Sequence, residues 1–433
     1  MKNQTVFDLA LAKHVAGEIV DAAIAYREML AADPDHVEAL HYLGVVLHQQ
    51  GNTAESIEMI LRALQLDASS PERYNDLGNI LTENGRFAEA RQAFSAALEL
   101  NATDANLWNN LGSVLHRLNE LPEAETAYRH AVSHSPNFVP ALNNLAALLA
   151  EQNKVEESSF FACRAYVQPP LTDKPLKMLG IAYYRLGLVA EAADCYRSWL
   201  DAEPDNPLAR HHLVACTGQD IPTKASDRYL ISLFDDIAEN FDSKLVGNLG
   251  YCGPDMVCSL LNDCLMANAN LSVLDGGCGT GLCAPVLKPY ARLLTGVDIS
   301  SRMLGKAAER ALYDDLVESE LTGYLTRKQQ AFDLITMADT LVYFGDLSEI
   351  FVLVRQALSP LGTFCFTVEQ TSSVEVPLGY QLNTSGRYSH SNRYLTDLLN
   401  ANGFMLLREH ETNIRHEFGK PTPGMGFLAR ALC

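Results

Sequence analysis

A spacing of 34 residues dominates the first half of the chain. Leucine recurs at this interval six times, at Leu9, Leu43, Leu77, Leu111, Leu145 and Leu179. A small residue directly follows each leucine, and a second small residue lies thirteen positions after the leucine. Small side chains at fixed places let two helix backbones approach closely, and neighbouring units then bury a shared core. The spacing predicts six stacked helix pairs, beginning near Asn3, Val37, Pro71, Ala105, Val139 and Asp173.

This register resembles the tetratricopeptide repeat. The resemblance implies an all-α solenoid over residues 1–217, in which Pro207 opens a capping helix. A polar connector with Gly218 and Pro222 follows, as is typical of a boundary between domains.

Asparagines lie just before the leucine in three of the units. They are Asn75, Asn109, Asn110, Asn143 and Asn144. A carboxamide both donates to and accepts from a peptide backbone, so a row of them can hold an extended segment. The row resembles the asparagine ladder of O-linked N-acetylglucosamine transferase, which implies a protein or peptide partner. Solvated helix residues and hydrogen bonds between helices are the alternative interpretations.

The charge and the cysteines restrict the partners and the location. The chain has 433 residues, too many for one core. Its net charge of −20 argues against a general nucleic-acid partner, because phosphate binding needs a basic face. The ten cysteines show no metal-ligand spacing, which favours reduced thiols and no metal site. Without a signal peptide or a run of about eighteen apolar residues, we expect a cytoplasmic protein with no membrane contact.

A second motif lies in the C-terminal half. An apolar run at residues 271–274 leads into an acid and a glycine-rich turn, and a second apolar run ends in Asp298. The dinucleotide fingerprint needs G-x-G-x-x-G, whereas Asp275 here precedes the glycines Gly277 and Gly279. A carboxylate at this place repels a phosphate and favours a cationic amine.

Strand and helix patterns alternate after residue 270, which predicts a Rossmann-like α/β domain over residues 218–433. The expected parallel strands are residues 272–275, 294–298, 316–319, 332–337 and 362–369, with an antiparallel pair at 404–410 and 426–431. Ligands of such sheets bind at the carboxyl ends of the strands, where the strand order reverses.

These motifs resemble the class I S-adenosylmethionine-dependent methyltransferases, and the whole chain resembles bacterial predicted methyltransferases that carry tetratricopeptide repeats. The resemblance implies S-adenosylmethionine as cofactor, with Asp275 near its methionine part, Asp298 on the ribose and Glu320 near the adenine amine. An N-cap role for Asp298 is an alternative, and so is an aromatic core for Phe241 and Tyr251, the expected lid. The implied cofactor-binding residues are Asp275, Gly276, Gly277, Cys278, Gly279, Asp298, Ile299, Met303, Glu320, Leu321, Asp339, Phe241 and Tyr251.

The catalytic candidates follow the fourth and fifth strands. Asp339 and Tyr343 should face the methyl group, although Asp339 could instead hold the amino group of the cofactor. In the polar loop at residues 379–390, His390 is a candidate base.

Three hypotheses about function stay open. The first is a methyltransferase acting on a protein or peptide that the repeats capture, and the second is a small-molecule methyltransferase whose repeats serve assembly. The third is a scaffold without catalytic activity.

Overall fold

The computed structural model describes residues 2–262, 264–371 and 376–432. The chain divides into two compact units, one ending at Pro169 and the other beginning at Pro170. Each unit has its own hydrophobic core or cores.

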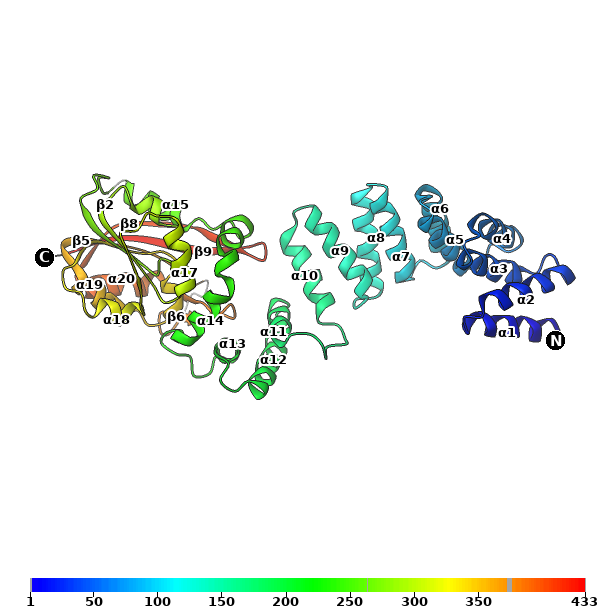
Figure 1. Cartoon of the computed structure of the whole chain (residues 1–433), viewed down its shortest axis with the longest axis horizontal. Coiled ribbons are helices and arrows are strands. Elements are labelled where there is room, and N and C mark those ends of the chain that lie inside the picture. Colours follow the sequence, from blue (N-terminus) through cyan, green and yellow to red (C-terminus); the bar gives the residue numbers. More distant parts are fainter. Residues whose placement is uncertain (1, 263, 372–375, 433) are drawn as a thin grey trace. The chain divides into compact units, whose positions relative to one another are not determined.

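The first unit consists of five antiparallel helix pairs, coloured blue to cyan in Figure 1. Their bounds are α1 Lys2–Val15, α2 Ile19–Ala32, α3 Val37–Gln49, α4 Thr53–Leu66, α5 Pro71–Glu83, α6 Phe87–Leu100, α7 Ala105–Arg117, α8 Leu121–His134, α9 Val139–Glu151 and α10 Val155–Tyr166. Helices α3, α5, α7 and α9 begin at the residues that the 34-residue spacing predicts, which confirms its register.

The glycine after the leucine in three of the pairs is explained by an aromatic residue on the second helix. A Cβ atom added at Gly78 would lie 2.6 Å from the Phe94 ring, and one at Gly112 would lie 2.7 Å from the Tyr128 ring. Carbon atoms cannot approach so closely, so the two helices of these pairs could not pack at this distance with a larger side chain.

The asparagines bond mainly to one another. Asn110 donates to the side-chain oxygen of Asn75 (3.2 Å), and Asn144 donates to that of Asn109 (2.9 Å). Each bond joins the first helices of two neighbouring repeats. This confirms the alternative interpretation, hydrogen bonds between helices, for these four residues. Asn143 is exposed. Asn110 also donates to the side-chain oxygen of Asn79 (3.3 Å), so both of its donor hydrogens are used, whereas Asn144 keeps one donor hydrogen for a ligand.

The second unit begins with the sixth helix pair. Helices α11 (Leu176–Arg185) and α12 (Val189–Ala202) form this pair, and α13 (Pro207–Thr217) is the predicted capping helix. Residues 170–217 thus share a compact unit with the sheet, whereas the repeat register continues through them. The division at residue 169 describes which residues pack together, whereas the repeat pattern continues to α13. We therefore keep residue 217 as the proposed end of the repeats.

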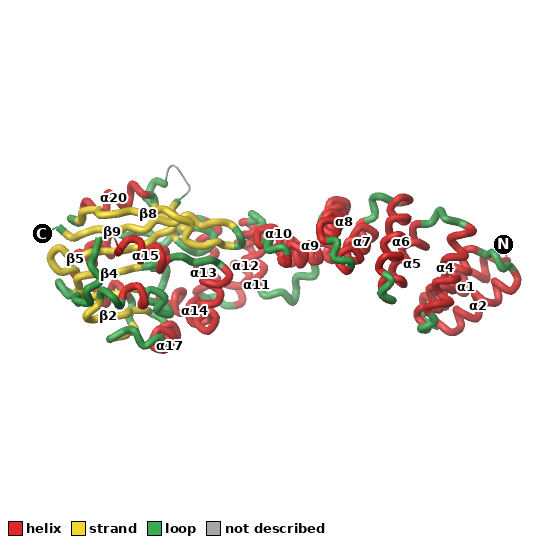
Figure 2. Tube along the Cα trace, turned by 90° about the horizontal axis from the view of Figure 1, so that it is seen from above, coloured by secondary structure: helices red, strands yellow, loops and turns green. Residues whose placement is uncertain are grey.

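A nine-stranded sheet forms the centre of the second unit, yellow in Figure 2. Its strands are β1 Leu271–Gly276, β2 Ala291–Asp298, β3 Asp315–Glu318, β4 Phe332–Met337, β5 Leu358–Gln370, β6 Tyr380–Leu382, β7 Tyr388–His390, β8 Phe404–Glu417 and β9 Lys420–Ala431. The order is β3-β2-β1-β4-β5-β7-β6, and β9 pairs antiparallel with β5 and β8. Strands β1 to β5 run parallel, so the order reverses between β1 and β4.

Side chains alternate between the two faces of this sheet, as the strand period of two requires. Leu274 and Ile335 join one core, and their neighbours Val273 and Leu334 join the other. The first core also contains α18 (Leu321–Leu325), α19 (Ser348–Ala357) and α20 (Asn392–Ala401). The second contains α15 (Gly253–Asn262) and α16 (Ala284–Leu287). The remaining helices are α14 Asp227–Ile237 and α17 Ser301–Glu309, the 3₁₀ turns Ala238–Asn240 and Leu341–Tyr343, and a π-helical turn at Ser243–Asn248.

The seven predicted strands are confirmed, and the loop predicted at residues 379–390 is wrong. This segment forms the hairpin of β6 and β7, whose second strand pairs with the end of β5 through Glu369 and Ser389. Strands of three residues carry too little periodicity to be read from the sequence.

Among the described residues, we find no helix with the length and apolar character needed to cross a membrane. The cytoplasmic location remains a prediction.

Candidate functional site

A glycine turn lies directly after β1, beside the first reversal of strand order. Gly277 and Gly279 have positive φ angles of 73° and 53°. A Cβ atom at Gly277 would collide with the Thr340 side chain. The turn therefore depends on glycine both for its backbone conformation and for its contact with the loop after β4.

Asp298 fastens this turn to the end of β2. One of its carboxylate oxygens accepts from the Gly279 amide (2.8 Å), and the other accepts from the Ser300 amide (2.9 Å). The N-cap of α17 is Ser300, whose hydroxyl accepts from the Met303 amide (3.1 Å). The N-cap alternative for Asp298 is therefore wrong. The Ile299 amide also hydrogen-bonds to this carboxylate, so of about four lone-pair directions one is left for a ligand.

Asp275 is buried at the end of β1, with 2% of its surface exposed. The Tyr313 hydroxyl donates to it at 2.6 Å. Burial raises the pKa of Asp275 to about 7, the nearby Asp298 adds to the rise, and the Tyr313 bond opposes it. A cation next to this carboxylate would remove much of the cost of its charge.

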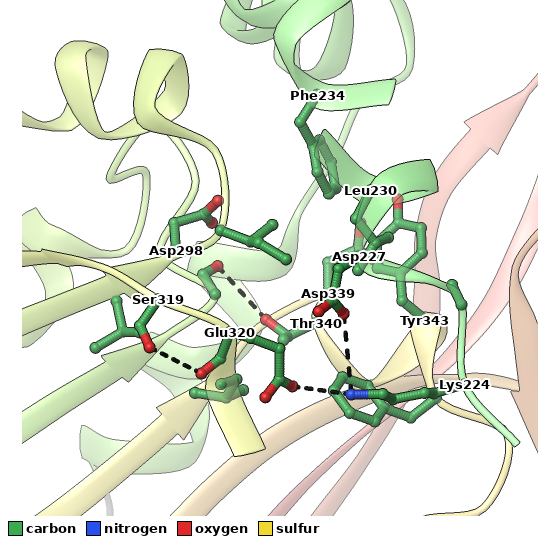
Figure 3. A pocket seen from close by; sticks show the side chains of 16 residues that line it. Lys224, Asp227, Leu230, Phe234, Asp298, Ser319, Glu320, Asp339, Thr340 and Tyr343 are labelled. Carbon is green, nitrogen blue, oxygen red and sulfur yellow. Dashed lines mark hydrogen bonds and ion pairs between the residues drawn. The ribbon is translucent and has the colours of Figure 1, made fainter. Parts of the chain in front are cut away.

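Glu320 caps the short helix α18 and pairs with a lysine from a distant segment. Its oxygens accept from the Thr322 and Gly323 amides (3.0 and 2.7 Å) and from the Thr322 hydroxyl (2.6 Å). Lys224 donates to the same carboxylate at 3.2 Å, as Figure 3 shows. Burial alone would raise the pKa of Glu320, but these hydrogen bonds outweigh it and lower the pKa.

A buried arginine organises the other side of the site. Arg415 has no exposed surface and donates to Asp339 (2.8 Å), Glu417 (3.0 Å) and Glu369. Asp339 has a φ angle of 55° and its amide donates to Thr367 (2.8 Å). Hydrogen bonds thus hold both the side chain and the backbone of Asp339. Its positive φ angle is one that non-glycine residues rarely adopt, and such backbone strain is common in functional sites.

Tyr343 lies opposite Asp339, in the turn that follows β4. Its ring packs edge-to-face on Phe234 at 5.4 Å between centroids. Arg387 donates to the Tyr343 hydroxyl oxygen at 3.5 Å and also pairs with Glu417. Because the oxygen accepts from Arg387, the hydroxyl proton of Tyr343 is left to donate into the cleft.

Two adjoining clefts open at these strand ends, of about 580 and 780 Å³. Gly277, Asp298, Asp339 and Tyr343 line both. The shared lining favours a ligand that extends across the two clefts.

Models of two known protein families match parts of this chain. Residues 252–409 match the methyltransferase domain, and residues 35–101 and 75–138 match the tetratricopeptide repeat. The chain carries a methyltransferase domain after tetratricopeptide repeats. S-adenosylmethionine is the cofactor that this assignment implies.

The C-terminal part is similar in sequence to two methyltransferases. A probable S-adenosylmethionine-dependent methyltransferase, CRG1 of Saccharomyces cerevisiae, is 28% identical over 173 residues, covering 38% of this chain and 57% of that protein. The ubiquinone biosynthesis O-methyltransferase of Pasteurella multocida is 28% identical over 113 residues, covering 23% and 47%. The chain thus spans about half the length of these relatives. A crystal structure of an S-adenosylmethionine-dependent methyltransferase from Mesorhizobium loti is 21% identical, covering 40% and 95%, with a TM-score of 0.33.

The clefts bring together almost all the residues that the sequence predicts for the cofactor. The larger is lined by Asp275, Gly277, Cys278, Gly279, Asp298, Met303, Asp339, Phe241 and Tyr251, and the smaller also by Ile299, Glu320 and Leu321. Gly276 lines neither cleft. It lies within β1, where a Cβ atom would meet Leu321 at 3.2 Å. Phe241 and Tyr251 also belong to a small apolar cluster, which agrees with the core interpretation, and their role as a lid stays a prediction.

His390 does not reach the methyltransferase clefts, contrary to the expectation for a catalytic base. It is fully buried in β7, and its Nε2 donates to the Gly345 carbonyl at 3.1 Å. Burial lowers its pKa to about 4. The prediction took residues 379–390 for an exposed loop, whereas the hairpin turns this side chain into the protein.

Three residues of the site were missed. Lys224 was placed in a connector, Tyr313 in no motif and Arg415 beyond the predicted end of its strand. The residues around Arg415 in β8 are mostly polar, so no apolar pattern marked this arginine as buried.

Proposed function

We propose that the protein transfers a methyl group from S-adenosylmethionine to a protein or peptide held by its repeats. The observation that carries the enzymatic part is the joining of the glycine turn to Asp298 beside the buried Asp275. The two carboxylates suit the amine and the sugar hydroxyls of the cofactor. A pyrophosphate on the glycine turn would lie beside the Asp275 carboxylate, which disfavours a dinucleotide.

The residues of the clefts fit a role in positioning. S-adenosylmethionine supplies an activated methyl group on a sulfonium that leaves as a neutral thioether. The protein then has to align the acceptor and exclude water. We assign the orientation of the acceptor to Asp339, which Arg415 fixes, and to the Tyr343 hydroxyl, which Arg387 leaves free to donate. Either group can accept or pass on a proton of the acceptor.

We expect the affinity for S-adenosylhomocysteine to fall below pH 7. Below its pKa of about 7, Asp275 is largely protonated in the free protein. That proton must leave before the carboxylate can pair with the ligand amine, so acid weakens binding. The dissociation constant should rise by up to about tenfold for each pH unit below 7, measured by isothermal titration calorimetry.

Asp275→Asn should bind more weakly and lose this pH dependence. Tyr313→Phe should shift the fall to higher pH, because the lost hydrogen bond no longer lowers the pKa of Asp275. A slope in Asp275→Asn equal to that of the native protein would contradict the role of Asp275.

The protein acceptor rests on the repeats, since tetratricopeptide arrays bind other proteins. Asn110 and Asn144 lie in one row. Both donor hydrogens of Asn110 are used within the array, so it offers acceptor capacity to a ligand, whereas Asn144 offers one donor hydrogen as well. We therefore expect Asn110→Ala/Asn144→Ala to lower labelling of acid-precipitable protein about tenfold when a lysate is incubated with the enzyme and methyl-labelled S-adenosylmethionine.

Asn106→Ala is the matched control, because Asn106 is exposed on the same helix as Asn110. Thermal unfolding of both variants checks that the lost interhelix bonds have not unfolded the array. Label that stays in the soluble small-molecule fraction, equal in both variants, would contradict peptide capture. It would favour a small-molecule acceptor, with the repeats serving assembly.

A further inference from the structure

Lys224 is held in place by the segment that connects α13 to α14. The Thr223 carbonyl accepts from the Gly345 and Asp346 amides (2.7 and 2.9 Å), and the Ala225 amide donates to the Tyr343 carbonyl (2.8 Å). Lys224 itself forms an antiparallel bridge with Phe344. These bonds attach the connector at residues 223–225 to the loop after β4. The backbone of the connector therefore forms a fixed wall of the smaller cleft.

Hydrogen bonds to the protein use the whole acceptor capacity of Glu320. A carboxylate offers about four lone-pair directions. One oxygen of Glu320 accepts from the Thr322 amide and Lys224, and the other accepts from the Thr322 hydroxyl and the Gly323 amide. The resemblance to class I methyltransferases implies that this side chain receives the purine amine. In this protein no lone pair is left for it.

The edge that Lys224 and Glu320 form therefore offers donors. An ammonium has three N–H donors and no acceptor. One donor goes to Glu320, and Asp227 lies at a looser 3.9 Å. A group with lone pairs fits beside Lys224, whereas an amine would compete with it for the same carboxylate.

We propose that Lys224 determines the purine specificity of the cofactor cleft: by pairing with Glu320 it removes the acceptor for the 6-amine, so the cleft does not discriminate that amine from an oxygen. Recognition of the base then falls to the apolar surfaces of the smaller cleft, such as Leu230, Ile299 and Leu321. The inference rests on the proposed function, because it assumes that the purine nucleoside binds there.

Calorimetric binding of two nucleosides tests the inference. S-adenosylhomocysteine and S-inosylhomocysteine differ at the purine 6-position, an amine in the first and an oxygen in the second. The native protein should bind them within about threefold of each other, less than one full hydrogen bond to a charged group. In Lys224→Met the freed oxygen of Glu320 should accept the amine, and preference for the adenosyl compound should rise about tenfold.

Lys288→Met is the matched control. Lys288 is as exposed as Lys224 and pairs with Asp314 at 2.9 Å, outside both clefts. It should keep the native ratio of affinities.

A native preference for the adenosyl compound of tenfold or more, unchanged in Lys224→Met, would overturn the inference while leaving the proposed function intact. Absence of binding of either compound to the native protein would overturn both. Because the native ratio needs no variant, the test holds even if Lys224→Met does not fold.

Discussion

Asp298→Ala should raise the dissociation constant of S-adenosylhomocysteine at least about a hundredfold. The change removes a carboxylate that we place on the ribose, and hydrogen bonds to a charged group contribute about 1.5–3 kcal/mol each. It also releases the Gly279 amide, so the glycine turn loses its tie to β2. Isothermal titration calorimetry measures the loss.

Asp314→Ala is the control for this change. Asp314 also accepts from a backbone amide, that of Leu294 at 2.8 Å, but lies outside both clefts. It should bind the ligand within about threefold of the native protein, since no contact to the ligand is lost. Native affinity in Asp298→Ala would remove the basis for placing the cofactor sugar at the end of β2.

Arg415→Met should destabilise the second unit by about 3–5 kcal/mol near neutral pH, because three carboxylates lose a buried cation. Arg387 and Arg415 together lower the pKa of Glu417 against the effect of burial. Without Arg415 the folded-state pKa of Glu417 rises. The deficit should therefore shrink as the pH falls and Glu417 takes up a proton. Urea unfolding at several pH values measures it.

Arg393→Met provides the comparison, since Arg393 is almost fully exposed and lies 3.9 Å from Asp397. It should change the free energy of unfolding by less than about 1 kcal/mol. The double variant Arg415→Met/Glu369→Gln lacks one of the buried carboxylates that Arg415→Met leaves without a cation. It should therefore recover part of the lost free energy of unfolding. Equal stability of Arg415→Met and Arg393→Met at all pH values would mean that the acids are not charged in the folded protein.

The position of Asp339 links this network to the proposed chemistry. Arg415 fixes the carboxylate that lines both clefts, and it pairs with Glu369 at the end of β5. We therefore expect changes in the network to reach the acceptor side of the site before the ribose side, because Asp298 is held by separate backbone bonds.

Much of this protein was determined by features that are local in the sequence. The 34-residue spacing places a glycine against a large side chain of the second helix, aromatic at Gly78, Gly112 and Gly180 and Ile60 at Gly44, so these pairs follow from the sequence. The order of Asp275, Gly277 and Gly279 predicted the turn after β1, because positive φ angles and close backbone contacts restrict those positions to glycine.

Only the tertiary structure decided the partners of the charged groups. Lys224 and Glu320 are 96 residues apart, and Asp339 and Arg415 are 76 apart, so no spacing rule could pair them. The hairpin of β6 and β7 buried His390 because its short strands take their register from the end of β5. Sequence periodicity reports which face of an element is apolar. The pairing of charges depends on which distant elements the fold brings together, and burial then makes those pairs obligatory.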